Sequence, residues 1–287
     1  MRIFSNHRLS SCLFILLTAA LYSCKPDEPV AITKKQTATF IHISHTRTND
    51  DNRISKRALH KDYEKYDLVL LGGDMTWSSS SSDTVMEHID SVFDIRANTT
   101  LWALGNHDDV GQISRIKAFT NRDPFYAYYH KGITFLVLHT QANFSKIEGE
   151  QLQLFNQVLD TLNQSSHLII LHHKLIWMAE HPVLDALIPD VSNGRKGDCY
   201  YCINENNFYT DLYPGIINTQ QKGIQVICLG GDIGKKTNAF EYRTEEGIYF
   251  LASGINDDDQ DHQALLFTHC EENRTLDWDF HLLEELP

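Results

Sequence analysis

The sequence predicts an α/β fold, a single layered domain with mixed β-sheets flanked by helices. Two observations predict it. Short apolar runs alternate with segments whose apolar residues recur at helical spacing, and from about residue 238 onward strand-like runs follow one another without helices. Strands that first alternate with helices and then continue alone are typical of layered α/β domains with mixed sheets.

The elements follow in order along the chain. Six apolar runs are predicted to be buried strands: residues 39–44, 68–71, 101–104, 133–138, 167–171 and 224–229. Two segments repeat apolar residues on one helical face and are predicted to be helices: residues 84–95 and 148–163. Four later runs are expected to form an antiparallel finish: residues 240–243, 248–252, 264–269 and 275–281.

The first residues have the pattern of a secretory signal rather than of folded structure. Arg2 and Arg8 precede an apolar run, Leu13 to Leu21, that is shorter than the roughly 20 residues of a membrane-spanning helix. The ending Leu-Tyr-Ser-Cys24 resembles a bacterial lipobox, in which Cys24 is the lipidated residue. We therefore predict a lipoprotein signal peptide at 1–23, a tether at 24–37 and one domain at 38–287. An ordinary signal peptide with an incidental cysteine is the alternative.

This prediction implies an exported protein of a bacterial cell envelope that meets the membrane only through its lipid anchor. The formal charge is −13, and removal of residues 1–23 leaves 23 basic and 38 acidic residues, a charge of −15. An acidic chain is a poor partner for nucleic acid, so no nucleic-acid partner is expected. An anionic substrate would need positive charge supplied locally, by a metal ion or by arginine.

Four cysteines remain if Cys12 is removed and Cys24 is lipidated: Cys199, Cys202, Cys228 and Cys270. An even number of cysteines in an exported protein favours disulfides. The pairing is left open: a Cys199–Cys202 disulfide is one interpretation, zinc binding by the same two residues is another, and Cys228 lies in an apolar run typical of a core.

Polar residues follow five of the predicted strands at the point where each strand ends. They are His45, Asp74, Asn106, His172 and Asp232. Ligands bind outside the carboxyl ends of strands in open α/β sheets, so these side chains are expected to meet at one edge. Five such endings in order are hard to attribute to turns alone, and they indicate a metal site.

The order of these motifs resembles that of the calcineurin-like metallophosphoesterases. Gly73-Asp74 and Gly105-Asn106-His107-Asp108 match the family's second and third motifs, and His172 within Leu171-His172-His173 matches its lone histidine. The resemblance covers about residues 38–270. It implies the family's layered fold for residues 38–287, hydrolysis of phosphoester bonds and the use of divalent metal ions.

Two motifs depart from the family pattern. Ser44-His45-Thr46-Arg47 stands where the family has Ser-Asp-x-His, and Gly231-Asp232-Ile233-Gly234 stands where it has Gly-His-x-His. Arginine stays protonated in proteins and glycine has no side chain, so one metal position is expected to be lost. The resemblance leaves one ion, manganese, iron, zinc or magnesium, to Asp74, Asn106, His172 and Asp232. A carboxylate in place of an imidazole favours the harder ions, manganese and magnesium.

Arg47, His45, His107 and Asp108 complete the expected site. Arg47 is predicted to clamp phosphate in place of the missing ion, because a guanidinium matches two phosphate oxygens. The alternative is that Arg47 forms an ion pair with Asp74 or Asp232 and occupies a site that is no longer active. His45 remains a ligand, a donor to phosphate or a core histidine. The resemblance implies that His107 assists the leaving oxygen and that Asp108 orients its ring.

The sequence thus predicts a metal-dependent phosphoester hydrolase with a single ion, acting on a phosphorylated small molecule, glycan or lipid. The alternative is a non-catalytic binding protein of the cell envelope that retains the fold. The altered motifs favour the alternative, whereas the retained Asp74, Asn106, His107 and His172 favour the enzyme. Trp77 and Trp177 are expected near a substrate pocket, and Trp102 in the core.

Overall fold

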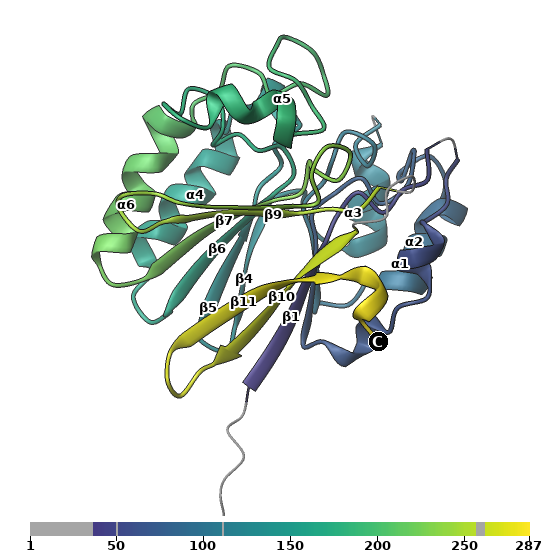
Figure 1. Cartoon of the computed structure of the whole chain (residues 1–287), viewed down its shortest axis with the longest axis horizontal. Helices are drawn as coiled ribbons and strands as arrows, with labels where there is room; N and C mark the ends of the chain where they lie inside the picture. Colours follow the sequence, from purple (N-terminus) through teal and green to yellow (C-terminus); the bar gives the residue numbers. More distant parts are fainter. Residues whose placement is uncertain (1–36, 50, 111, 257–261) are drawn as a thin grey trace, which may run out of the picture. The chain divides into compact units, whose positions relative to one another are not determined.

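Two mixed β-sheets lie face to face in the computed structural model, which describes residues 37–49, 51–110, 112–256 and 262–287 (Figure 1). The five-stranded sheet has the order β11 (Thr275–Leu282), β10 (Gln263–Cys270), β1 (Thr37–Ile43), β2 (Leu68–Leu71), β3 (Thr100–Trp102). The six-stranded sheet has the order β4 (Tyr126–His130), β5 (Ile133–Val137), β6 (His167–His172), β7 (Gln225–Gly230), β9 (Tyr249–Ser253), β8 (Ala239–Arg243).

The central strands of each sheet run parallel. β1, β2 and β3 form the parallel part of one sheet, and β5, β6, β7 and β9 form that of the other. Antiparallel strands complete the edges, with β10 and β11 on one sheet and β4 and β8 on the other. The carboxyl ends of the parallel strands of each sheet therefore lie at one edge of it, where ligands bind in such sheets.

Alternation along each strand divides the core into three parts. In β1, Phe40 faces the other sheet and meets Phe135 edge to face at 5.7 Å, whereas Ile41 and Ile43 face the helices. Successive side chains of a strand point to opposite faces, so fully apolar strands supply both the inter-sheet core and the outer cores.

Helices cover both outer faces, giving a layered helix–sheet–sheet–helix arrangement. On the five-stranded sheet lie α1 (Lys56–Leu59), α2 (Asp83–Phe93) and α3 (Ile113–Thr120). On the six-stranded sheet lie α4 (Gly149–Thr161), α5 (Ile188–Val191) and α6 (Tyr213–Gln221). Short helical turns occupy Tyr63–Lys65, Ala142–Ser145, Asp185–Leu187, Phe208–Leu212 and Leu283–Glu285.

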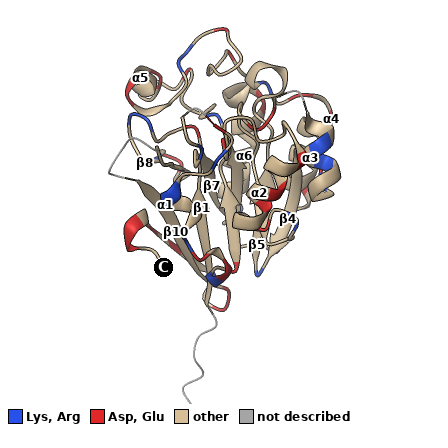
Figure 2. Ribbon diagram, turned by 90° about the vertical axis from the view of Figure 1, so that its right-hand side faces the viewer, with Lys and Arg blue, Asp and Glu red and all other residues tan. Residues whose placement is uncertain are grey.

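Acidic and basic positions are interspersed along the helices and loops of the face shown in Figure 2. With a formal charge of −13, the chain as a whole repels anions. Any site for an anionic ligand must therefore draw on cations placed within it.

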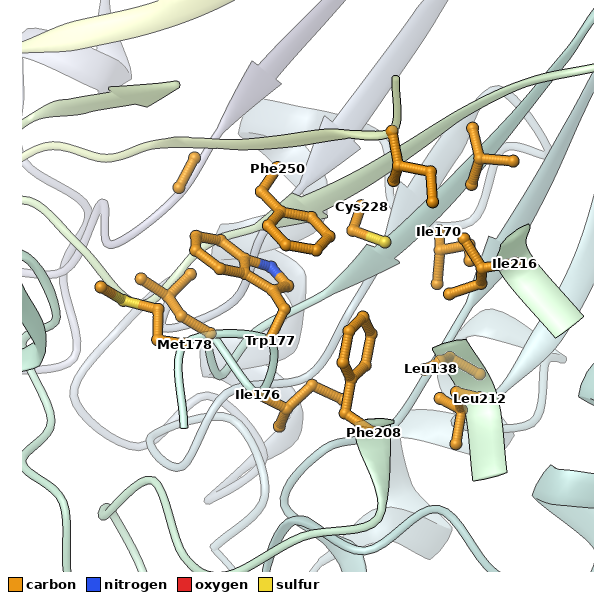
Figure 3. Packing of buried hydrophobic residues seen from close by; sticks show 14 of the residues in the cluster. Leu138, Ile170, Ile176, Trp177, Met178, Phe208, Leu212, Ile216, Cys228 and Phe250 are labelled. Atoms are coloured by element: carbon orange, nitrogen blue, oxygen red, sulfur yellow. The ribbon is translucent and has the colours of Figure 1, made fainter. Parts of the chain in front are cut away.

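Trp177 belongs to the core and not to a pocket wall, so the expectation that it shapes a substrate pocket is wrong. Its ring stacks on Phe250 with 4.9 Å between centroids (Figure 3). It also stacks on Phe240, with 5.4 Å between centroids. Phe208 packs against the same Phe250 ring. This aromatic cluster fills the space between β9 and the turns before α6. Trp102 is buried, as expected.

The predicted fold class is confirmed, and each predicted strand and helix is present within a few residues of its expected ends. The last four strands differ in one respect: they form two antiparallel pairs that join different sheets. β4, α3 and α6 were not predicted. The expected signal peptide 1–23, Cys24 and the tether as far as residue 36 lie outside the described residues. Among those described, no helix is long and apolar enough to cross a membrane.

Candidate active site

Two glycines bring the turns of the two sheets together at the carboxyl edge. A Cβ atom on Gly231, after β7, would lie 1.9 Å from the carbonyl oxygen of Gly72, after β2. Only glycine permits this approach. Ser44 Oγ donates to the Gly231 carbonyl at 2.6 Å, and His173 Nδ1 donates to the Gly72 carbonyl at 2.7 Å. The loops that follow β1, β2, β6 and β7 are thereby held against one another.

A cavity of about 270 Å³ opens at this junction. Its lining residues come from loops of both sheets: His45, Arg47, Asp74, Asn106, His107, Asn193, Gly194, Tyr201, Asp232 and Lys235. Six residues expected at the site are thus brought together, namely His45, Arg47, Asp74, Asn106, His107 and Asp232. His172 and Asp108 are not among the lining residues.

The Asp74 carboxylate is the centre of this cluster. Its Oδ1 accepts the backbone N–H of His107 at 3.0 Å, and its Oδ2 lies 3.4 Å from His45 Nε2 and 3.9 Å from Arg47 Nε. Burial alone would raise the pKa of Asp74, but the neighbouring His173 and the hydrogen bond from the His107 backbone N–H act in the opposite direction, and that pKa is lowered. The carboxylate is therefore ionised and surrounded by potential cations.

Backbone strain marks the same point. Asp74 has φ of 60° and His45 has φ of 57°, in the left-handed region that residues with a Cβ seldom adopt. Each such conformation costs on the order of 1 kcal/mol or more and is typical of functional sites. The His45 backbone N–H donates to the Gly73 carbonyl at 2.9 Å, which holds the two turns in this arrangement. Burial lowers the pKa of His45 to about 3, so its ring is neutral.

His173, and not His172, stands beside the two carboxylates. β6 ends at His172, whose ring shares the outer face with Ile170 and donates through Nδ1 to the Lys174 carbonyl at 2.8 Å. The next residue points the opposite way, because side chains alternate along a strand. His173 Nε2 therefore lies 3.6 Å from Asp74 Oδ1 and 3.8 Å from Asp232 Oδ1. The histidine beside the two carboxylates is therefore His173, one residue beyond the histidine expected from the motif.

The Nε2 atom of His173 is buried and has no hydrogen-bond partner. Its Nδ1 must carry a proton, because its neighbour, the Gly72 carbonyl, can only accept. In the neutral ring, Nε2 would then turn a lone pair toward two carboxylates, which is repulsive. A proton or a metal ion on Nε2 relieves this repulsion. Burial opposes the charged ring, but Asp74 and Asp232 outweigh it and raise the pKa of His173.

Asp232 is held by the chain segment that follows α5. Its Oδ2 accepts the backbone N–H of Gly194 at 3.3 Å and the Ser192 hydroxyl at 3.3 Å. Burial raises the pKa of Asp232 to about 6, with His173 acting in the opposite direction. Its Oδ1 remains directed toward His173.

Asp108 does not orient the His107 ring, so that expectation is wrong. Its carboxylate instead accepts the backbone N–H groups of Asp74 at 2.6 Å, Met75 at 3.0 Å and Gly105 at 2.8 Å. Asp108 thus binds backbone N–H groups of the turns after β2 and β3, and it thereby fixes the position of Asp74.

The His107 ring is oriented by Trp77. Nδ1 of His107 donates to the Trp77 carbonyl at 2.7 Å, and the two rings lie 4.7 Å apart between centroids. The carbonyl oxygen can only accept, so Nδ1 carries a proton and Nε2 is left for a ligand in the cavity. Trp77 thus lies near the site, as expected, through its contacts with His107 and Arg47.

Arg47 is anchored without being neutralised by a close partner. Its guanidinium lies 4.8 Å above the Trp77 ring, a cation–π contact, and Nη1 donates to the Thr48 carbonyl at 3.4 Å. The approach of Nε to Asp74 Oδ2 is 3.9 Å, and Nε makes no hydrogen bond. Contact with Asp74 is therefore long, and most of the donors of the fork remain available to a ligand.

These residues do not fit a two-ion centre. Arg47 stands where one ligand of the first ion is expected, and Gly234 stands where another is expected. A Cβ on Gly234 would lie 2.3 Å from the Ile255 carbonyl, so this turn has no room for a side chain. The first ion position therefore lacks two of its four expected ligands, whereas His45 and Asp74 remain.

The cavity contains side chains of the types that bind a single ion, namely carboxylate, amide and imidazole groups. No group of three or more His, Cys, Asp or Glu side chains in the described ranges is drawn closely enough together to hold an ion. The distances of 3.6 and 3.8 Å from His173 Nε2 to the carboxylates are nevertheless only slightly longer than the roughly 3.0–3.4 Å between ligands of an ion with bonds of about 2.1 Å. The buried Nε2 of His173 has no hydrogen-bond partner and faces both carboxylates. An ion between these groups would require the side chains to move closer together by a few tenths of an ångström.

Sequence reasoning missed one wall of the cavity. Asn193, Gly194 and Tyr201 come from the segment after α5, and Lys235 from the turn after β7. The signal that was available is the Cys199-x-x-Cys202 spacing: the two cysteines form a disulfide, one of the two interpretations weighed, which excludes them as zinc ligands. Cys228 and Cys270 are buried and free.

Comparisons with known proteins place the chain in a family. The family model described as calcineurin-like phosphoesterase matches residues 41–231, more than half of the chain. No curated protein matches. Solved structures with a similar fold include a dimetal phosphatase from Danio rerio (12% identity, 80% of this chain and 95% of that chain, TM-score 0.46).

Two others are nucleotidases of which this chain spans about half. They are the NAD nucleotidase of Haemophilus influenzae (13% identity, 86% of this chain and 50% of that chain, TM-score 0.43) and a 5′-nucleotidase precursor from Thermus thermophilus (12% identity, 88% and 56%, TM-score 0.41). Likenesses this remote do not bear on activity. The family-model match runs from β1 to the Gly230-Gly231 turn and includes all residues that line the cavity except Asp232 and Lys235, which follow it. The chain belongs to the calcineurin-like phosphoesterase family.

Proposed function

We propose that the protein hydrolyses phosphoester bonds with a single divalent ion, held by Asp74, Asn106, His173 and Asp232, and with Arg47 as its phosphate clamp. Its family comprises phosphoesterases, which generally use divalent metal ions. The observation that carries the finer proposal is the cavity of about 270 Å³, which places an arginine with unused donors beside a cluster of metal-type ligands.

Each group in the cavity has a chemical role in this proposal. When bound, the ion supplies positive charge that polarises the phosphoryl group and acidifies water. Arg47 holds two phosphoryl oxygens, a geometry that its planar fork matches. The bond from His107 Nδ1–H to the Trp77 carbonyl leaves Nε2 to face the substrate, and in the doubly protonated ring the Nε2–H gives its proton to the leaving oxygen, which leaves a neutral imidazole. His45, neutral and close to Asp74, donates to phosphate or joins the ligands.

The proposed substrate is a phosphorylated small molecule, including the head of a glycan or lipid. A chain of charge −13 disfavours polyanions such as nucleic acid. The positive charge that a single phosphate needs is supplied inside the cavity by Arg47 and Lys235. The site therefore suits an anion of small size.

We also propose that residues 38–287 are the catalytic domain of an exported lipoprotein anchored through Cys24. The basis is the signal pattern of residues 1–24. In a bacterial expression host, Cys24→Ala should release the protein from the membrane fraction or leave an uncleaved precursor. Membrane association and processing identical to wild type would contradict the lipoprotein assignment.

The activity is tested by metal analysis of the purified protein together with hydrolysis of phosphomonoester and phosphodiester probes in manganese, iron, zinc and magnesium. We expect close to one ion per chain and turnover that Asp74→Ala or Asp232→Ala abolishes. Two tightly bound ions would contradict the assignment of the lost site.

A binding protein without turnover is the second candidate, favoured by one observation. In the described ranges the ligand side chains are not closed around an ion, and Arg47 approaches Asp74. Such a protein would bind inorganic phosphate in the cavity while all four metals fail to support hydrolysis. That combination would replace the enzyme proposal with this one.

A further inference from the structure

The segment Asn193–Asn204, here called the strap, contributes Asn193, Gly194 and Tyr201 to the lining of the cavity. Its first end is fixed to the loop after β7. The Asn193 backbone N–H donates to the Asp232 carbonyl at 2.9 Å, and Asn193 Oδ1 accepts the backbone N–H of Lys235 at 2.8 Å. Gly194 donates to the Asp232 carboxylate. This end therefore belongs to the six-stranded side of the cavity.

The far part of the strap is fixed to the opposite sheet. The Tyr200 hydroxyl donates to the carbonyl of Asp109, the residue that follows the Asn106–Asp108 turn after β3. Asp109 Oδ2 in turn lies 3.3 Å from Nε2 of the buried His139. The strap thus joins loops of both sheets across the site, with Tyr201 lining the cavity between the two attachments.

Internal bonds hold the strap in a fixed conformation. The Cys199–Cys202 disulfide closes its tip. Asn204 Nδ2 donates to the carbonyls of Gly197 and Cys199, both at 3.0 Å, and Asn204 Oδ1 accepts the fully buried Lys174 ammonium at 3.2 Å. A loop tied at both ends, across its tip and at its base has little freedom to swing away from the cavity.

The strap limits the size and shape of the substrate that can reach the phosphoryl site. A phosphodiester has two substituents that leave the phosphorus in different directions and needs an open groove, whereas a phosphomonoester has one and enters end-on. The cavity volume of about 270 Å³ lies at the low end of the roughly 300–1,000 Å³ of ligand pockets. We propose that the strap restricts the site to phosphomonoesters of small molecules and excludes diesters, an inference that rests on the proposed function.

The probes are p-nitrophenyl phosphate and bis(p-nitrophenyl) phosphate, with kcat/KM measured for the wild type, Tyr200→Phe, and Cys199→Ser with Cys202→Ser. Tyr129→Phe, an exposed tyrosine on β4, is the matched control. We expect the wild type to favour the monoester at least about tenfold, about 1.4 kcal/mol of transition-state discrimination. Both strap variants should raise the diester-to-monoester ratio about tenfold, and the control should not.

Equal or greater activity of the wild type on the diester would overturn the inference, as would an unchanged ratio in both strap variants. Absence of turnover on both probes would instead contradict the proposed function. In that event the strap is judged by binding of phenyl phosphate and diphenyl phosphate to the wild type. Preference for phenyl phosphate supports the restriction, and equal or tighter binding of diphenyl phosphate contradicts it.

Discussion

At the residue scale, the centre of the site is Nε2 of His173, which lies between two carboxylates. His173 Nε2 faces Asp74 and Asp232 at 3.6 and 3.8 Å, and its other ring nitrogen is committed to a carbonyl oxygen. The two carboxylates raise the pKa of His173 and favour a proton on Nε2, so an ion that binds there displaces that proton. Metal affinity should therefore rise with pH, since fewer rings are then protonated.

A pair of neighbouring variants separates the two adjacent histidines. His173→Asn should abolish stoichiometric metal binding, because the proposed ligand is gone. His172→Asn should keep the ion and lose roughly 1–3 kcal/mol of unfolding free energy, since a buried hydrogen-bonding group is altered. Metal content per chain and urea unfolding measure both effects. Loss of the ion in the His172 variant alone would restore the ligand set expected from the motif.

The choice between His172 and His173 shows where sequence reasoning stops. Both residues follow the same apolar run, and the motif resemblance selects the first. Which of the two histidines faces the carboxylates depends on which residues of β6 point to the outer face of the sheet. The pairing of β6 with β5 and β7 determines this. A shift of one residue along a strand reverses the side on which a side chain lies.

At the scale of elements, Asp108 ties the turn after β2 to the turn after β3. Its carboxylate accepts three backbone N–H groups and the Ser79 hydroxyl, the latter at 2.5 Å. It thereby fixes the backbone on which Asp74 adopts its left-handed conformation. The site depends on Asp108 through the position of Asp74.

Asp108→Asn should lower the unfolding free energy by roughly 2–4 kcal/mol, because an amide –NH₂ would face donors that now bind a carboxylate. Metal binding should weaken as Asp74 is displaced. Chemical denaturation and metal titration of the variant provide the check. A stable variant with normal metal affinity and reduced turnover alone would return Asp108 to the role of orienting His107.

Strands could be predicted better than helices, for reasons visible in particular segments. β2 and β6 are continuous apolar runs closed by glycine or histidine, and burial on both faces leaves no other interpretation. α6 contains Gly215 and carries few apolar residues, so its periodicity is weak. The strap could not be predicted, because its position depends on contacts with Asp232, Asp109 and Lys174.

At the scale of the whole molecule, several histidines are folded into the interior in neutral form. Burial lowers the pKa of His42 to about 3 and the pKa values of His167 and His172 to about 4. In the unfolded chain each would bind a proton below about pH 6.5. Between about pH 6.5 and pH 4 the folded state therefore binds fewer protons than the unfolded chain. The contribution of these histidines to the unfolding free energy is fully present above about pH 6.5 and is lost as the pH falls toward 4.

His167, at the edge of the six-stranded sheet opposite the cavity, isolates this effect from the site. His167→Gln should reduce the loss of unfolding free energy between pH 7 and pH 4.5 by on the order of 2 kcal/mol. His60→Gln, at an exposed histidine, should leave that loss as it is in the wild type. Urea unfolding at a series of pH values provides the comparison. An equal pH dependence in the His167 variant would show that His167 is not held neutral.

In the proposed site, Arg47 replaces the positive charge of the lost ion. Titration of Mn²⁺, and then of phosphate, into wild type, Arg47→Ala, Arg47→Lys and Arg243→Ala tests this most directly. Arg243 is the matched control, because it also stacks on an aromatic ring, that of Tyr249, on a strand outside the cavity. All four proteins should bind one ion.

Phosphate affinity should fall about tenfold to a hundredfold in Arg47→Ala, roughly 1.5–3 kcal/mol, as one charge-assisted contact is lost. It should recover in part in Arg47→Lys, which lacks the fork, and remain unchanged in Arg243→Ala. Two ions in the wild type, or tighter metal binding with unaltered phosphate affinity in Arg47→Ala, would contradict the account.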